Sequence, residues 1–262
     1  VGVLSPGKQA DIAIISDLGQ MKVEGVLLKG KIVASKGELL IDLPKYYYPS
    51  EVKNSVKISP IDEKMLEIKS DSHNPTVRAL VVIPDQNLTE KFEDTIRVIQ
   101  GVAQPDTTKD MLTIACIERY GKTSNIGKAF VKGFGLIDGA FAESVAHDSH
   151  NIIVTGTNYK DMTLAVNKVI EIGGGIAVAK RNRILTEMRL PVGGLITDEL
   201  NGHEVSSKIA EIENIITKEL GCKIHSPLMH LSFLSLTTSP TWKITDKGLI
   251  DVNDFKILST IV

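Results

Sequence analysis

Hydrophobic and polar positions alternate in short runs through residues 1–43, and this pattern predicts strands joined by tight turns. The run Ala10–Ile15 is rich in β-branched residues. The runs Val23–Leu28 and Lys31–Ser35 are separated by Lys29-Gly30, where a glycine supplies the positive φ angle of a hairpin turn. These strands are too few to close a sandwich, so we expect them to complete a β-sandwich whose other strands lie elsewhere.

The pattern changes between residues 44 and 75, where hydrophobic periodicity fades. Pro44, Pro49 and Pro60 punctuate a charged segment that also contains three consecutive tyrosines. We interpret residues 44–75 as a linker that lies over the surface of a second domain, which spans residues 76–262.

Residues 76–262 mix strand-like and helix-like periods without a regular alternation of the two. Helices are predicted at Tyr159–Ile172, which follows Asn158, and at Glu204–Leu220, which Gly221 ends. The whole chain is therefore predicted to be α+β, a short β-sandwich remnant followed by a mixed α/β C-terminal domain, rather than a doubly wound sheet. A shorter helix is predicted at Asn125–Lys132, and strands are predicted at Thr76–Ile83, Leu112–Glu118, Ala140–Ala146, Asn151–Thr155, Gly175–Ala179 and Leu231–Leu236.

Composition and charge exclude several classes of protein. The chain has 42% hydrophobic and 24% charged residues, close to the globular averages of about 45–50% and about 25%, which excludes a disordered, collagenous or coiled-coil protein. The net charge of −2 lacks the concentrated basic surface that nucleic acid requires, so no nucleic-acid partner is expected. No apolar run approaches the ~18 residues of a membrane span, so no membrane partner is expected either.

The first residue and the cysteines indicate whether the chain comes from a longer protein and in which cellular compartment it is found. The chain starts with Val1 rather than Met, so we expect it to be the later part of a longer or processed protein. No signal peptide opens it, and Cys116 and Cys222 lie too far apart to suggest a disulfide framework. We therefore expect a cytoplasmic protein, with Cys116 packed in the core.

The densest polar cluster lies between two predicted strands. It comprises His147, Asp148, His150 and Asn151, with Ser144 just before them. Two imidazoles and a carboxylate so close together could bind a metal or the edge of a purine. The alternative is a polar turn whose side chains cap their own backbone. A zinc site takes three or four protein ligands, so this cluster alone is not a complete metal site.

Other polar residues are weaker candidates for a site. Thr157 and Asn158 begin the predicted Tyr159 helix, where backbone N–H groups favour an anion, although simple helix capping explains them equally. The Gly173-Gly174-Gly175 run follows a helix instead of opening one, so it does not predict a phosphate-binding loop. Structural or solvent-facing roles are expected for His73, His203, His225 and His230, whereas Glu118 and Arg119 could face a pocket or end a strand in solvent.

The stretches Gly133–Leu136 and Gly139–Val154 resemble the carboxy-terminal domain of bacterial adenine deaminases. Residues Ser5–Asp11 resemble the point where amidohydrolases leave their barrel and resume a small β-sandwich. Further stretches that fit the family are Asn125–Gly127, Phe130–Lys132, Ile172–Gly175, Leu190–Leu195 and Leu231–Leu234.

This resemblance implies an intact enzyme that converts adenine and water to hypoxanthine and ammonia, using manganese or iron held in a (β/α)₈ barrel. The barrel and its metal ligands would lie before Val1, in the same chain or on another one, so the resemblance places no metal and no catalytic residue in this segment. It implies that His147–Asn151 approaches the purine pocket or braces it, and that the enzyme is a homo-oligomer. Two alternatives stay open, a non-catalytic ligand-binding or assembly module, and a metal site at the His147–His150 turn.

Overall fold

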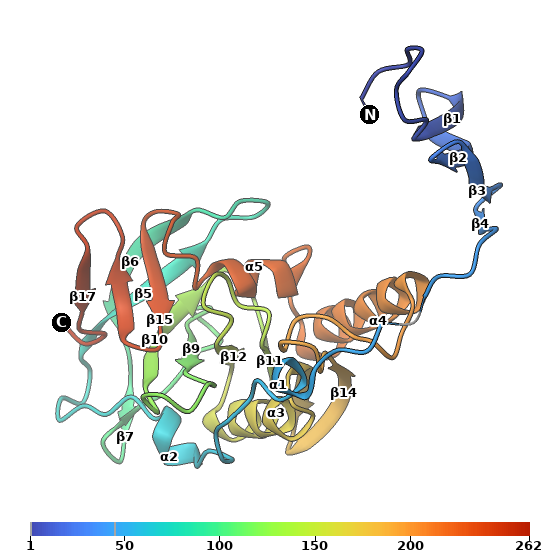
Figure 1. Ribbon diagram of the computed structural model, residues 1–262. Coiled ribbons are helices and arrows are strands. Elements are labelled where there is room, and N and C mark those ends of the chain that lie inside the picture. The colour runs from blue at the N-terminus through green and yellow to red at the C-terminus, as the bar shows by residue number, and fades with distance from the viewer. Residues whose placement is uncertain (1, 45) are drawn as a thin grey trace. The chain divides into compact units, whose positions relative to one another are not determined.

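The computed structural model describes residues 2–44 and 46–262. The chain divides into two compact units, Val1–Tyr47 and Tyr48–Val262 (Figure 1).

The smaller unit is one antiparallel sheet in the order β1-β2-β3-β4. Its hairpin turn carries positive φ angles at Lys29 and Gly30, as the sequence predicted. Among the described residues of this unit only Gly25 is buried, because a single small sheet cannot cover its own faces. That these strands belong to a sandwich stays a prediction. The strands are β1 (Ile12–Asp17), β2 (Lys22–Leu28), β3 (Lys31–Ser35) and β4 (Glu38–Leu39).

The larger unit is built on an eight-stranded sheet in the order β14-β13-β11-β12-β9-β10-β5-β6. Neighbouring strands run antiparallel except β10 and β5, which are parallel. The central strands are buried on both faces, which explains their continuous apolar sequences. The eight strands are β5 (Thr76–Val82), β6 (Thr89–Thr95), β9 (Leu112–Ile117), β10 (Ile126–Lys132), β11 (Ala140–Glu143), β12 (Ile152–Gly156), β13 (Gly175–Lys180) and β14 (Arg183–Arg189).

One face of this sheet is covered by helix α3 (Tyr159–Glu171). Its buried stripe includes Met162 and Val166, and it packs on small residues of the strands such as Ala142. The Asn167 side chain accepts a hydrogen bond from Ile61 N at 2.8 Å and donates one to Ile61 O at 3.0 Å, so the segment before β5 is fixed to α3. This segment contains the short helices α1 (Ser50–Lys53) and α2 (Glu63–Leu66).

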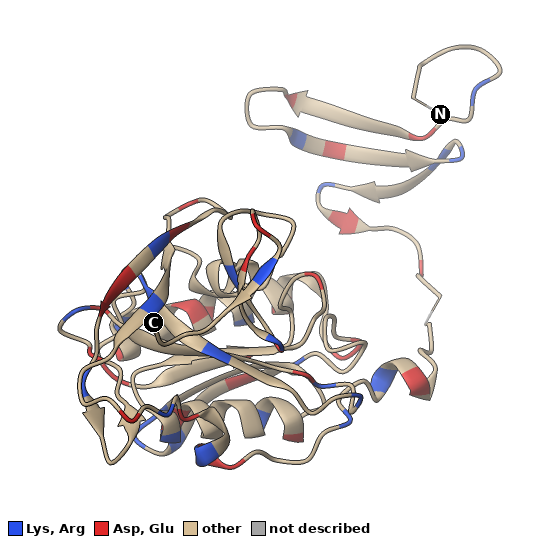
Figure 2. Cartoon of the chain, turned by 90° about the vertical axis from the view of Figure 1, so that its left-hand side faces the viewer, with Lys and Arg blue, Asp and Glu red and all other residues tan. Residues whose placement is uncertain are grey.

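The other face is covered by helices at one end and by a small sheet at the other (Figure 1). Helix α4 (Gly202–Leu220) contacts β13 and β14, and helix α5 (Pro227–Phe233) contacts β12. Acidic and basic residues are intermixed over the larger unit (Figure 2). The small sheet comprises β15 (Trp242–Thr245), β16 (Gly248–Asp251) and β17 (Lys256–Leu258), and a separate ribbon pairs β7 (Val98–Ile99) with β8 (Val102–Ala103).

The α+β prediction is confirmed, and two predicted elements are wrong. Residues Asn125–Lys132 form strand β10 rather than a helix, because they lie between β9 and β5 in the middle of the sheet. A Cβ atom on Gly127 would lie 1.8 Å from Thr245 O, so the glycine allows the β15–β16 turn to reach the strand. Residues Leu231–Leu236 are not a strand either, since helix α5 runs through Phe233 and Pro227 starts it.

The predicted strand Ala140–Ala146 is shorter in the structure and ends at Glu143. The positions of the linker and domain boundaries stay predictions, although residues 48–75 belong to the larger unit. Within the described part of the chain, no helix has the length and apolar character needed to cross a membrane.

Candidate functional site

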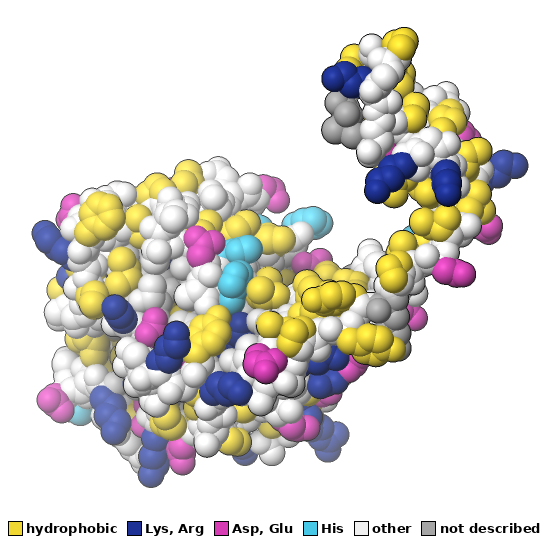
Figure 3. Space-filling view, viewed as in Figure 1, with side chains coloured by type: hydrophobic (Ala, Val, Ile, Leu, Met, Phe, Trp, Pro, Cys, Tyr) yellow, Lys and Arg dark blue, Asp and Glu magenta, His cyan; other side chains and the backbone are white. Residues whose placement is uncertain are grey.

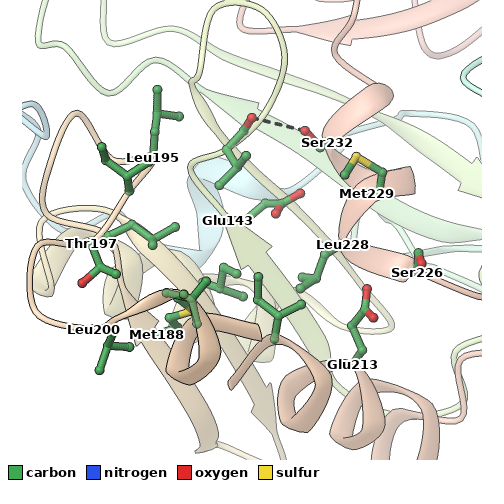
Figure 4. A pocket seen from close by; sticks show the side chains of 17 residues that line it. Glu143, Met188, Leu195, Thr197, Leu200, Glu213, Ser226, Leu228, Met229 and Ser232 are labelled. Carbon is green, nitrogen blue, oxygen red and sulfur yellow. Dashed lines mark hydrogen bonds between the residues drawn. The ribbon is translucent and has the colours of Figure 1, made fainter. Parts of the chain in front are cut away.

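The predicted polar cluster forms the connection between β11 and β12, and helix α5 packs against it. His147 N donates to Ser232 O at 3.2 Å, while Ser235 Oγ donates to His147 O at 2.7 Å. Ser232 Oγ donates in turn to Val145 O at 3.2 Å, the bond drawn as a dashed line in Figure 4. The turn is therefore held in place by backbone and hydroxyl contacts with α5 and the residues just after it.

The two histidine rings lie against each other, with centroids 5.6 Å apart and an interplanar angle of 62°. His147 also stacks on Phe233 at 5.3 Å, and its Nδ1 is 3.9 Å from Asp148 Oδ1. His150 Nδ1 lies 3.2 Å from Val145 O, so one of its ring nitrogens already has a partner. Histidine side chains reach the surface beside hydrophobic ones (Figure 3).

This turn does not fit a metal ion. In the part of the chain that the structure describes, no three His, Cys, Asp or Glu side chains are grouped so that they could hold one. A stacked His147 and a backbone-bonded His150 offer fewer than the three protein ligands of a catalytic zinc site.

Ser144 and Asn151 flank the turn and are buried. Ser144 Oγ donates to Gly194 O at 2.6 Å and accepts from Gly175 N at 2.8 Å, so it joins strand β13 to a loop that covers the sheet. Asn151 Oδ1 has no hydrogen-bond partner among the described residues. Of the residues predicted for the site, Ser144 therefore has a clear structural role, while Asn151 keeps an unused acceptor.

Thr157 and Asn158 are not brought to this turn. They follow β12 at the end opposite to Asn151, and the six residue steps from Asn151 to Thr157 span roughly 20 Å along the strand. Thr157 Oγ1 accepts from Gly139 N at 3.0 Å, and Asn158 Oδ1 accepts from Asp161 N at 2.7 Å as the N-cap of α3. The capping alternative explains both residues.

Glu118 and Arg119 are buried, so neither ends a strand in solvent. Burial would raise the pKa of Glu118, but four backbone N–H groups lower it below its usual value. Arg119 Nη2 donates to Gly193 O at 2.7 Å, and its Nε donates to His150 O. Burial lowers the pKa of Arg119, which nonetheless stays a cation that ties the turn to the covering loop.

A cavity of about 600 Å³ opens beside the turn, between the sheet, α4, α5 and the loop before α4 (Figure 4). Its walls are mainly apolar, with Met188, Leu195 and Leu228 among them, and two carboxylates, Glu143 and Glu213, line it. We call it the Glu143 cavity. It falls in the volume range of about 300–1,000 Å³ that small-molecule sites occupy.

Glu143 is the residue that sequence reasoning missed. Alternation along β11 turns Ala140 and Ala142 toward α3. It turns Phe141 toward the core of the opposite face and Glu143 into the cavity on that face. Glu143 is 2% exposed and its Oε1 has no partner among the described residues. Burial, aided by the charge of Glu213, raises its pKa well above the usual value. The signal in the sequence was a lone charge inside an otherwise apolar strand.

The fold and the cavity together define an α+β domain with a small-molecule-sized pocket on one face of its sheet. The chain belongs to the family described as the Adenine deaminase C-terminal domain, whose family model matches residues 86–256. This membership confirms the resemblance stated from the sequence.

Curated relatives match the chain almost from end to end. It is 62% identical over 261 residues to "Adenine deaminase 1" of Carboxydothermus hydrogenoformans, covering 100% of this chain and 43% of that protein. It is 37% identical over 263 residues to the adenine deaminase of Methanococcoides burtonii, with 100% and 44% covered. An adenine deaminase of Dehalococcoides mccartyi is 39% identical over 260 residues, with 98% and 44% covered. The chain thus spans less than half the length of these relatives.

Proposed function

We propose that this chain is the C-terminal part of an adenine deaminase, an enzyme that hydrolyses adenine to hypoxanthine and ammonia. The observation that carries the proposal is the 62% identity to a protein named adenine deaminase over 100% of this chain. The match to less than half of that protein supports a catalytic barrel outside these residues, in the same chain or on another.

The metal of the reaction belongs to that barrel in this proposal, and manganese or iron is the ion that the family resemblance favours. The imidazoles of His147 and His150 do not fit such an ion, so we assign no step of the reaction to them. The proposal also includes a cytoplasmic homo-oligomer.

The segment His147–Asn151 has a bracing role in the proposal. Arg119 donates to the carbonyl of His150, and the Ser235 hydroxyl donates to the carbonyl of His147. The turn therefore offers a rigid polar edge to a purine pocket. His147 has a third of its side chain exposed and can still donate or accept at its ring. Asp148 is largely exposed and can pair with it.

Turnover of adenine tests the proposal at two levels. The intact protein that contains this chain is expected to convert adenine to hypoxanthine in the presence of manganese. The change in ultraviolet absorbance measures this conversion. The 262-residue chain alone is expected to show none. An intact protein without this activity, or a clear turnover by the chain alone, would contradict the proposal.

The role of the turn is tested by His147→Ala in the intact protein. We expect kcat/KM to fall by more than about twofold, which is the change of about 0.4 kcal/mol below which a residue counts as structural only. Thr157→Ala is the matched control, because Thr157 lies at the other end of β12 and should leave kcat/KM unchanged. Equal values for the two variants would show that the turn does not serve the purine pocket.

A further inference from the structure

We propose that the Glu143 cavity binds a flat nitrogen heterocycle that presents a hydrogen-bond donor and an acceptor on neighbouring atoms, as a purine base does. The choice of adenine as its occupant rests on the proposed function. The site lies in this domain and uses none of the four polar residues His147, Asp148, His150 and Asn151.

The anchor of the site is the carboxyl group of Glu143. It points into the space between the loop that carries Leu195 and helix α5, which carries Met229 (Figure 4). With 2% exposure and no partner for Oε1 among the described residues, it leaves a hydrogen-bonding group unused. A buried polar group without a partner destabilises the fold, and a ligand that supplies the partner removes that cost.

The protonation of Glu143 decides what it recognises. Because burial and Glu213 raise its pKa, Glu143 keeps its proton at pH values where an exposed glutamate has lost it. A protonated carboxyl group presents an O–H donor next to a C=O acceptor. Adenine offers the complementary pair, an exocyclic amine beside a ring nitrogen, so the two groups can form two parallel hydrogen bonds.

The rest of the lining selects against a phosphate. Apolar side chains such as Ile176 and Leu190 can cover the two faces of a flat ring. Among the described residues that line the cavity, none is Lys, Arg or His, and the second charged group is Glu213. A nucleotide would place its phosphates beside carboxylates, so a base or nucleoside is the fitting occupant.

Calorimetric titration of the 262-residue chain with adenine tests the proposal. N6,N6-dimethyladenine keeps the ring but lacks the amine hydrogens, and we expect it to bind at least about tenfold more weakly than adenine. Adenosine monophosphate is expected to bind more weakly still. Thermal unfolding of each variant used below shows that it is folded.

Two substitutions of Glu143 distinguish the effect of its hydrogen bonds to the ligand from the effect of its side-chain volume. Glu143→Gln keeps a donor beside an acceptor, so adenine affinity should stay within about threefold. Glu143→Leu keeps the approximate volume without polar atoms and should weaken adenine by at least about tenfold.

Three results would each overturn the proposal: no adenine binding, equal binding of adenine and its dimethyl analogue, or undiminished binding by Glu143→Leu. Loss of binding in a folded Glu143→Gln variant would also overturn it, since an ionised carboxylate would then be the partner. Such failures leave the deaminase proposal standing, because turnover by the intact protein tests that separately.

Discussion

The two faces of the eight-stranded sheet are made by the same strands and yet differ in kind. On the α3 face, which we call the sealed face, Met162 and Val166 are fully buried. Asn167 of α3 forms two hydrogen bonds to Ile61, in the segment that contains α2. On the α4 and α5 face, which we call the hollow face, the packing is interrupted by the Glu143 cavity of about 600 Å³. The Glu143 carboxyl group in it has an oxygen without a partner among the described residues.

This difference shows how a sheet can separate stability from binding. Ala142 and Glu143 are neighbours in β11, but alternation turns the Ala142 side chain toward the sealed face and the Glu143 side chain into the cavity of the hollow face. The sealed face can hold the strands in place, so the hollow face can carry a polar group that costs stability. The His147 turn follows β11 directly, and Arg119 ties this turn to the loop around Gly193.

The largest expected effect is a contrast between two buried methionines. Met162→Ala on the sealed face should lower the free energy of unfolding by about 3 kcal/mol, because the removed side chain leaves a new void. Met188→Ala on the hollow face should cost less than about half as much, since Met188 already borders a cavity. Chemical denaturation of residues 1–262 measures both.

Equal losses for the two methionine variants would break the comparison, because they would show that the cavity is as tightly supported as the sealed layer. Met65→Ala is a suitable control, since Met65 is 43% exposed and its truncation should change stability little.

The next effect concerns Arg119, which ties the His147 turn to the loop around Gly193. Arg119→Ala should cost about 2–3 kcal/mol, because Gly193 O and His150 O lose a charged donor while they stay covered. Hydrogen exchange should quicken in the turn and in the loop around Gly193. Arg183→Ala, at an exposed position, should change neither the free energy of unfolding nor hydrogen exchange. Hydrogen exchange that stays slow in Arg119→Ala would show that Arg119 does not hold the turn in place.

The sequence was sufficient for elements whose local pattern agrees with their packing. Helix α3 has both an N-cap at Asn158 and a buried stripe at helical spacing, so its prediction is confirmed. Strand β10 was mistaken for a helix because its identity depends on β9 and β5, which are distant in sequence. Pro227 at the start of α5 was a local signal that the apolar run after it obscured.

The candidate site was harder to foresee for a physical reason. Polar residues crowded in one turn are visible in a sequence, whereas the cavity arises from β11, α4, α5 and a loop that meet only in the folded chain. Glu143 looks like an exception within an apolar strand, and its meaning depends on which face it reaches. Thr157 and Asn158 are near the turn in sequence but separated from it by the length of β12.

A smaller effect follows from the unpartnered carboxyl group. Glu143→Gln should raise the free energy of unfolding by about 1–2 kcal/mol above neutral pH, because the amide avoids a buried charge. The pKa of Glu143 is raised in the folded state, so its stabilising contribution is complete below the usual glutamate pKa and is lost as pH rises through the raised one. The free energy of unfolding, measured from about pH 5 to about pH 8, should therefore fall more steeply in the natural chain than in the variant. Parallel pH curves would contradict the assignment, and exposed Glu63→Gln is the control.

The smallest effect tests whether the far end of β12 is purely structural. Asn158→Ala removes the cap of α3 on the sealed side and should lower the free energy of unfolding by about 0.5–1 kcal/mol. Adenine binding to the 262-residue chain and kcat/KM of the intact protein should stay unchanged, because about 20 Å of strand separates Asn158 from the turn. Asn158→Asp keeps an accepting oxygen and should restore stability. If Asn158→Ala weakened adenine binding while unfolding stayed the same, the sealed face would share in recognition and the division between the two faces would fail.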